Sequence, residues 1–200
     1  MKPLLRLPLV LALIAVLALA GCSQSASYSA HDVTGLMPDL SFQLTDENGQ
    51  AVTAADYAEA PLTLLFFGYT NCPDVCPLTL SHLSSALAGL DPDVRDKIKV
   101  LFVSVDPKRD TPQRLKKYTA HFGPQFVGLT GTQDELKRFT KAMRVTYGYG
   151  EPNADGFYLV SHSGAVFVFD NQQQVRLLIN QQEKVDAITT DLQTLLNVTT

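Results

Sequence analysis

The chain has 200 residues, of which 46% are hydrophobic and 18% charged, and this composition excludes an intrinsically disordered protein. Its formal net charge of −4 lacks the basic excess of nucleic-acid-binding domains, so we expect no nucleic-acid partner. Three cysteines are too few for a small disulfide-built fold, and the length predicts one domain with one hydrophobic core.

The first 22 residues are organised like a lipoprotein signal peptide. Lys2 and Arg6 precede a short apolar stretch, and small residues follow it, as in secretory signals. The run Leu-Ala-Gly-Cys at residues 19–22 resembles the bacterial lipobox, which implies removal of residues 1–21 and lipidation of Cys22. An uncleaved N-terminal anchor is the alternative. In both cases we expect an extracytoplasmic domain that is attached to a bacterial membrane, faces the periplasm or cell exterior, and follows a Ser/Ala-rich tether over residues 22–36.

From residue 37 onward, strands and helices are predicted to alternate. Residues 40–44 and 51–53 flank a turn-forming run and predict a β-hairpin. The continuous apolar run 61–67 predicts a strand buried on both faces, and residues 98–105 predict its parallel neighbour. The remaining predicted elements are helices over about 77–90, 111–121, 132–143 and 183–196, a strand over 126–130, and paired strands over 165–170 and 175–179. This order predicts an α/β layered fold.

Two cysteines follow the first buried strand, at the point where the chain enters a helix. Three residues separate Cys72 from Cys76, and Pro73 restricts the backbone between them. Open α/β sheets bind ligands at the carboxyl ends of their strands, and a helix N-terminus favours the thiolate form of cysteine. Because thiolates bind metals and attack disulfides, the pair is a candidate metal site or redox pair. The alternatives are a structural disulfide and two small core side chains.

His162 is the histidine best placed to complete such a site. It follows a Gly- and Pro-containing loop and precedes an apolar strand, and functional residues are common at such positions. A surface histidine is the alternative interpretation. The other histidines have structural explanations, because His31 lies in the tether, His82 lies off the cysteine face of its helix, and His121 ends a helix.

Charged residues near these positions also have structural explanations. Asp74 is positioned to cap the following helix, and Asp106 precedes a proline in a turn. Lys108, Arg109 and Asp110 predict an exposed turn of mixed charge. Asp106 facing the site and a partner contact by the 108–110 turn are the alternatives, and we expect neither Asp74 nor Asp106 to be a metal ligand.

Three motifs resemble those of the SCO/SenC family. They are FGYTNCPDVCP at residues 67–77, VSVDPKRDTP at 103–112 and YLVSHS at 158–163, and their order and spacing match that family over about residues 36–197. The resemblance implies a thioredoxin-like α/β fold for residues 37–200, with a central mixed sheet flanked by helices and an N-terminal β-hairpin. One departure is Ser161, which replaces the acidic residue often found before the histidine.

The resemblance also implies a site and a biological role. Family members bind one copper ion through two cysteines and a histidine, which implies Cys72, Cys76 and His162 as ligands here. Members deliver copper to the binuclear copper site of cytochrome c oxidase, or keep the cysteines of that site reduced. The implied partners are the oxidase subunit that carries this site, other copper chaperones and thioredoxin-like reductants. Soft thiolates select Cu(I), and imidazole suits both copper states.

Three other functions compete with copper handling. A metal-independent extracytoplasmic thiol–disulfide oxidoreductase normally has a Cys-x2-Cys motif, which is one residue shorter than the spacing here. A peroxiredoxin-like peroxidase is disfavoured because Tyr69 stands where its motif has Thr. A binding module with a structural disulfide would not require His162. Because copper binding needs reduced thiols, a disulfide between the cysteines would be a metal-free state.

Overall fold

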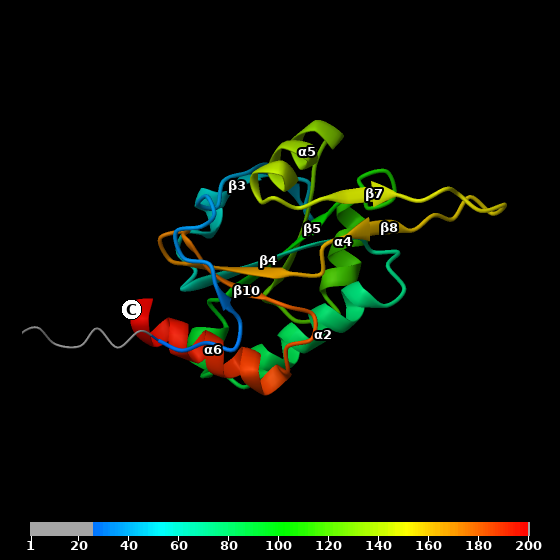
Figure 1. The fold of residues 1–200 in the computed structure, drawn as a ribbon. Coiled ribbons are helices and arrows are strands. Elements are labelled where there is room, and N and C mark those ends of the chain that lie inside the picture. Colours follow the sequence, from blue (N-terminus) through cyan, green and yellow to red (C-terminus); the bar gives the residue numbers. More distant parts are fainter. Residues whose placement is uncertain (1–25, 200) are drawn as a thin grey trace, which may run out of the picture.

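The computed structural model describes residues 26–199, so the predicted signal peptide and the lipidation site Cys22 lie outside the described residues. A mixed eight-stranded sheet forms its centre, with the strand order β1-β10-β9-β4-β5-β6-β2-β3 (Figure 1). Its strands are β1 (His31–Asp32), β2 (Gln43–Asp46), β3 (Ala51–Thr53), β4 (Leu62–Gly68), β5 (Lys99–Ser104), β6 (Phe126–Thr130), β9 (Val166–Asp170) and β10 (Val175–Ile179).

Helices cover both faces of this sheet. They are η1 (Ala54–Tyr57), α2 (Val75–Ala88), α3 (Pro92–Arg95), α4 (Pro112–Thr119), α5 (Gln133–Ala142) and α6 (Val185–Thr199). The helices α2, α4 and α6 lie on one face, and α5 lies on the other (Figure 1). This mixed, helix-flanked sheet confirms the predicted fold class, and β2 pairs with β3 as the predicted hairpin.

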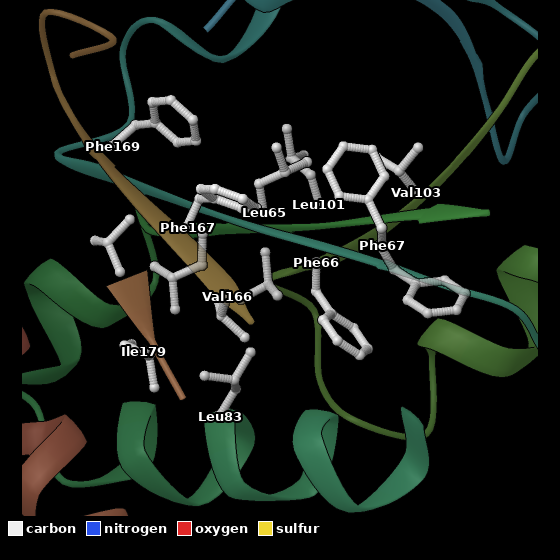
Figure 2. Packing of buried hydrophobic residues seen from close by; sticks show 14 of the residues in the cluster. Leu65, Phe66, Phe67, Leu83, Leu101, Val103, Val166, Phe167, Phe169 and Ile179 are labelled. Carbon is white, nitrogen blue, oxygen red and sulfur yellow. The ribbon is translucent and has the colours of Figure 1, made fainter. Parts of the chain in front are cut away.

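The central strand β4 holds the segment that leads to the cysteines. All seven of its residues are buried, and it pairs in parallel with β5 and antiparallel with β9, which confirms the predicted parallel pair. Phe66, Val166 and Leu83 meet between the sheet and α2 (Figure 2). On the opposite face Phe67 packs against Phe139 of α5. Each buried ring contributes about 1.5–3 kcal/mol to stability, so this end of β4 is firmly held.

The N-terminal segment differs from the tether expected over residues 22–36. His31 pairs with Leu178 of β10, so these residues add an edge strand to the sheet. Asp191 of α6, which is buried, accepts hydrogen bonds from the backbone N–H groups of Ser29 at 3.0 Å and Ala30 at 2.7 Å. Because a buried carboxylate requires donors, this contact fastens the segment to the domain and leaves a shorter tether than predicted.

A second, two-stranded sheet was absent from the sequence-based expectations. It pairs β7 (Tyr147–Tyr149) with β8 (Val160–His162), and Tyr147 lies directly opposite His162. The hairpin projects from the body of the molecule beyond the end of the main sheet (Figure 1). Among the residues that the structure describes, no helix combines the length and apolar character needed to cross a membrane.

Candidate metal centre

The structure brings Cys72, Cys76 and His162 together. One ligand atom from each residue lies within 4.8 Å of the others, and Sγ of Cys76 is 3.3 Å from Nε2 of His162. Cys76 is buried, whereas Cys72 and His162 are half-buried, so the cluster opens to the surface on one side. Two sulfurs and one imidazole nitrogen at this spacing fit the donor set that soft metal ions such as Cu(I) prefer.

Gly68 provides the space that the buried thiol occupies. A Cβ atom at position 68 would lie 2.7 Å from Sγ of Cys76 and 2.7 Å from Cε2 of Phe102. Contacts this short are sterically forbidden, so a larger residue at the end of β4 would displace the thiol or the ring. The glycine of the first motif is therefore part of the site, because it lets α2 carry Cys76 against the strand end.

The imidazole of His162 is held in a defined orientation. Its Nδ1 lies 2.9 Å from the backbone carbonyl of Ser163, and because a carbonyl only accepts, Nδ1 carries the proton. The lone pair of Nε2 then faces the thiols, as a metal ligand requires. The rings of Phe66 and Tyr69 pack edge-on against the imidazole, with centroid distances of 5.9 and 5.8 Å.

The two thiols differ in acidity. A hydrogen bond from the Cys76 side chain, with further donation from backbone N–H groups, lowers the pKa of Cys72 to about 4 although partial burial opposes this. The backbone N–H of Cys76 is one of these donors, 3.4 Å from Sγ of Cys72. The same side-chain hydrogen bond and burial raise the pKa of Cys76 above its ordinary value. The metal-free pair therefore holds one proton, with the thiolate on Cys72.

Asp110 anchors the loop that carries Cys72. Its carboxylate is 1% exposed and accepts from the backbone N–H of Thr70 at 3.0 Å, the Thr70 hydroxyl at 2.5 Å and the Ser104 hydroxyl at 2.6 Å. A buried carboxylate with three donors is well satisfied and fixes the residues that donate to it. The turn after β5 thereby holds the cysteine loop in place.

Asp106 and Arg109 hold the hairpin that carries His162. The buried Asp106 carboxylate is ion-paired with Arg109 and accepts from the Tyr158 hydroxyl at 2.9 Å. Arg109 in turn donates to the backbone carbonyl of Tyr158 at 2.9 Å and stacks over its ring. Tyr158, which receives these contacts, lies four residues before His162. The contacts therefore fix the start of β8 and, with it, the position of the imidazole relative to the thiols.

The predicted exposed turn over residues 108–110 was wrong for two of its members. Asp110 is buried and Arg109 is largely covered, because each bonds to a segment about 40 or more positions away in the chain. The available signal was their place directly after a buried parallel strand, where sheets gather functional residues. Asp74 does occupy the N-cap position of α2, but its side chain accepts no capping hydrogen bond.

The remaining histidines lie away from the cluster. His31 belongs to the edge strand β1. His121 follows α4, and its Nδ1 lies 3.3 Å from the backbone carbonyl of Tyr118. His82 is on α2 and lines a small hollow with Ile179 and Glu183.

The mixed sheet, the helices on both of its faces and the cysteine pair at the start of α2 define a thioredoxin-like protein. Within that class, the sequence model of the SCO1/SenC family matches residues 37–197, which is most of the chain. The chain therefore belongs to the SCO1/SenC family.

Individual relatives agree with this assignment. A SCO2-like protein of Rickettsia conorii is 38% identical over 133 residues, a match that covers 64% of this chain and 62% of the relative. Copper-bound ScoI structures from Arabidopsis thaliana and Bradyrhizobium japonicum resemble this fold with TM-scores of 0.74 and 0.69, at 31% and 36% identity. These two similarities cover 80% and 78% of this chain, and 98% and 97% of the solved chains.

Proposed function

We propose that this protein binds one copper ion through Cys72, Cys76 and His162 and delivers it to the binuclear copper site of cytochrome c oxidase. The observation that carries this proposal is the convergence of the three ligand atoms within 4.8 Å. The soft donor set favours copper, and two solved relatives in the same family contain copper. Closed structural zinc sites usually have four ligands, whereas this cluster offers three and is open on one side.

The arrangement also suits release of the ion. Cys72 and His162 are the half-buried members of the cluster, so an incoming ligand can replace them before it reaches Cys76. His162 lies on a hairpin outside the main sheet, which is fastened through Tyr158 and Tyr149 to the segment after β5, while the imidazole itself packs against Phe66 of β4. The recipient therefore meets the two exposed ligands first, and the buried thiolate leaves the ion last.

A second activity, reduction of the cysteines of the client site, is favoured by the asymmetry of the two thiols. The Cys72 thiolate would attack a client disulfide, forming a mixed disulfide and releasing one client thiolate. Cys76, after losing its proton, would attack Sγ of Cys72 and release the second client thiolate, leaving a Cys72–Cys76 disulfide. Two electrons thus pass to the client, and the half-exposed, acidic thiol is the one that attacks first.

His162→Ala separates the two activities. The substitution removes one copper ligand and keeps both thiols, so we expect copper delivery to fail while disulfide reduction continues. The assay mixes the protein with the soluble domain of the oxidase subunit that carries the binuclear site, offered once with reduced and once with oxidised cysteines. His82→Ala is the matched control on α2. Delivery by the His162→Ala variant at the parent rate would refute the copper proposal.

We also propose that Cys22 carries a lipid that holds the domain on the outer side of a bacterial membrane. The signal-like sequence at residues 1–22 supports this, and the packing of Ser29 and Ala30 on α6 leaves only a short linker to the domain. Mass spectrometry of the membrane-bound parent protein should show a chain that begins at Cys22 and carries an acyl group there, and Cys22→Ser should lack that group. A parent protein that retains residues 1–21 and carries no lipid would instead establish the uncleaved anchor.

A further inference from the structure

A cationic patch, formed by Lys137, Lys141 and Arg144, lies on the outer side of α5. The residues are four and three positions apart, which places them on one face of the helix and of the residues just after it. Together with Asp134 they line a hollow of about 600 Å³. Within the described part of the chain, none of the three cations forms an ion pair.

Helix α5 accounts for only part of this patch, because Lys141 in its last turn complements the helix dipole. The chain as a whole is acidic, with 20 acidic and 16 basic residues, so a cluster of positive charge is a local exception. Like charges four residues apart, such as Lys137 and Lys141, destabilise a helix by about 0.2–0.5 kcal/mol. Asp134 lines the same hollow and offsets one of the three charges, so the patch keeps a net positive charge and presents a positive potential to the solvent.

The patch is continuous with the candidate metal centre. Tyr147 lines the same hollow as the three cations, and Gln133 of α5 donates to its hydroxyl at 2.8 Å. Tyr147 is also the cross-strand partner of His162, and both residues line an adjoining hollow of about 470 Å³. A partner that binds the patch would therefore be separated from the imidazole of His162 only by the neighbouring Tyr147.

Exposed apolar side chains lie beside Cys72 and on the elements that carry the candidate ligands. Leu159 is 52% exposed and lines the hollow beside Cys72, and Leu78 on α2 is 51% exposed. Phe157 on the hairpin is 41% exposed. An interface that covers the thiols would bury Leu159, and the cations would then lie at its polar edge, as charged residues do in protein interfaces.

We propose that Lys137, Lys141 and Arg144 dock an acidic surface of the protein that exchanges copper or electrons with Cys72 and Cys76. The identity of this partner rests on the proposed function, whereas the chemistry of its surface follows from the patch. Complementary charge accelerates encounter and fixes orientation, so the patch would direct the partner's metal-binding site toward His162.

The position of the patch favours a protein over a lipid surface. Figure 1 shows α5 and α6 on opposite sides of the sheet. The described chain begins on the α6 side. The segment at Ser29 and Ala30 is fastened to Asp191 of α6, so an attachment through the N-terminus holds the α6 side toward the membrane. The patch then faces away from the bilayer.

The test compares two double variants that remove the same charge. Lys137→Gln/Lys141→Gln removes two cations of the patch, and Lys97→Gln/Lys184→Gln removes two exposed lysines elsewhere that form no ion pair in the described structure. Arg144 is left unchanged because its φ of 53° lies in the left-handed region, so a substitution there would alter backbone strain as well as charge. The rate of association of the reduced, metal-free protein with the soluble oxidase domain is measured at two ionic strengths.

We expect the patch variant to associate about tenfold more slowly at an ionic strength of ~0.02 M and within about twofold of the parent at ~0.5 M, where the charges are screened. The control variant should stay within about twofold of the parent at both. Equal slowing of the two variants, no slowing of either, or no association by the parent would overturn the proposal.

Two further measurements keep the proposal separate from the proposed function. Copper transfer is followed in matched mixtures that contain the copper-loaded protein, and a parent that associates through the two lysines without transferring copper would refute delivery and leave the docking surface established. Copper transfer at a rate that neither the lysine substitutions nor salt changes would support delivery and refute the docking surface. Sedimentation with vesicles of phosphatidylglycerol and phosphatidylcholine gives the lipid comparison. Vesicle binding that needs Lys137 and Lys141, with unchanged protein association, would also overturn the proposal.

Discussion

The guanidinium group of Arg109 lies 3.6 Å from the centre of the Tyr158 ring and donates to the backbone carbonyl of the same residue at 2.9 Å. Because Arg109 is also ion-paired with the buried Asp106, one side chain joins the turn after β5 to the hairpin that ends at His162. Arg109 is therefore a positioning residue for the imidazole, although it contacts none of the three candidate ligands.

Arg109→Met is expected to weaken both the fold and the site. It leaves the Asp106 carboxylate buried without its cation, which costs about 3–5 kcal/mol in the free energy of unfolding. It also releases Tyr158 and thereby the hairpin that carries His162, so the Cu(II) absorption spectrum should change. Arg109→Lys, which restores the charge but not the planar stack, should recover part of the stability and less of the spectrum. Urea unfolding and absorption spectra provide the measurements.

Arg138→Met, an exposed arginine on α5, is the control for removal of a surface cation and should leave both properties unchanged. An Arg109→Met protein with the parent's copper affinity and spectrum would show that the hairpin holds its position without this contact.

Gly68→Ala tests whether the strand end must make room for the thiol. The added methyl group would lie 2.7 Å from Sγ of Cys76, so we expect a loss of about 1–3 kcal/mol in stability together with weaker copper binding. Gly148→Ala is the control near the site, because its nearest atom, the Ser161 hydroxyl at 3.3 Å, belongs to a side chain that can rotate. Equal behaviour of the two variants in unfolding and copper titration would contradict the assignment.

Cys72 is expected to react as a thiolate at neutral pH. Since its pKa is lowered to about 4, the thiolate remains populated as the pH falls, and alkylation of the metal-free protein should keep a constant rate from pH ~8 to ~6. An ordinary thiol would slow by about a hundredfold over that range. Cys76→Ala removes the main hydrogen-bond donor, so the pH dependence should return. A steep pH dependence in the parent protein would refute this account of the pair.

The main sheet apart from its edge strand β1 was predictable, because its other strands are encoded locally. The central strands around Leu64 and Leu101 are continuous apolar runs, and α5 begins with a capping box between Thr132 and Glu135, which four consecutive residues encode. Their places beside strands made the cysteine pair and His162 candidates, the resemblance to the SCO/SenC family joined them into one ligand set, and the structure brings them together.

The missed features depend on contacts between distant residues. The β7–β8 hairpin has no apolar run, and the Tyr149 hydroxyl ties it to the backbone carbonyl of Val105, 44 positions away. Asp110 bonds to Thr70 across 40 positions, and Asp106 to Tyr158 across 52. A turn-like sequence gives no sign that its carboxylates are buried, because that follows only once the cysteine loop and the hairpin pack against it.

Copper stoichiometry and Cu(II) absorption of the reduced protein from residue 23 onward, measured beside His162→Ala and His82→Ala, test the central claim most directly. The account predicts one copper per chain with thiolate charge-transfer bands in the parent and in His82→Ala, and weaker binding with altered bands in His162→Ala. A parent protein with free thiols that binds no stoichiometric copper, or a His162→Ala variant that matches it in affinity and spectrum, would contradict the account.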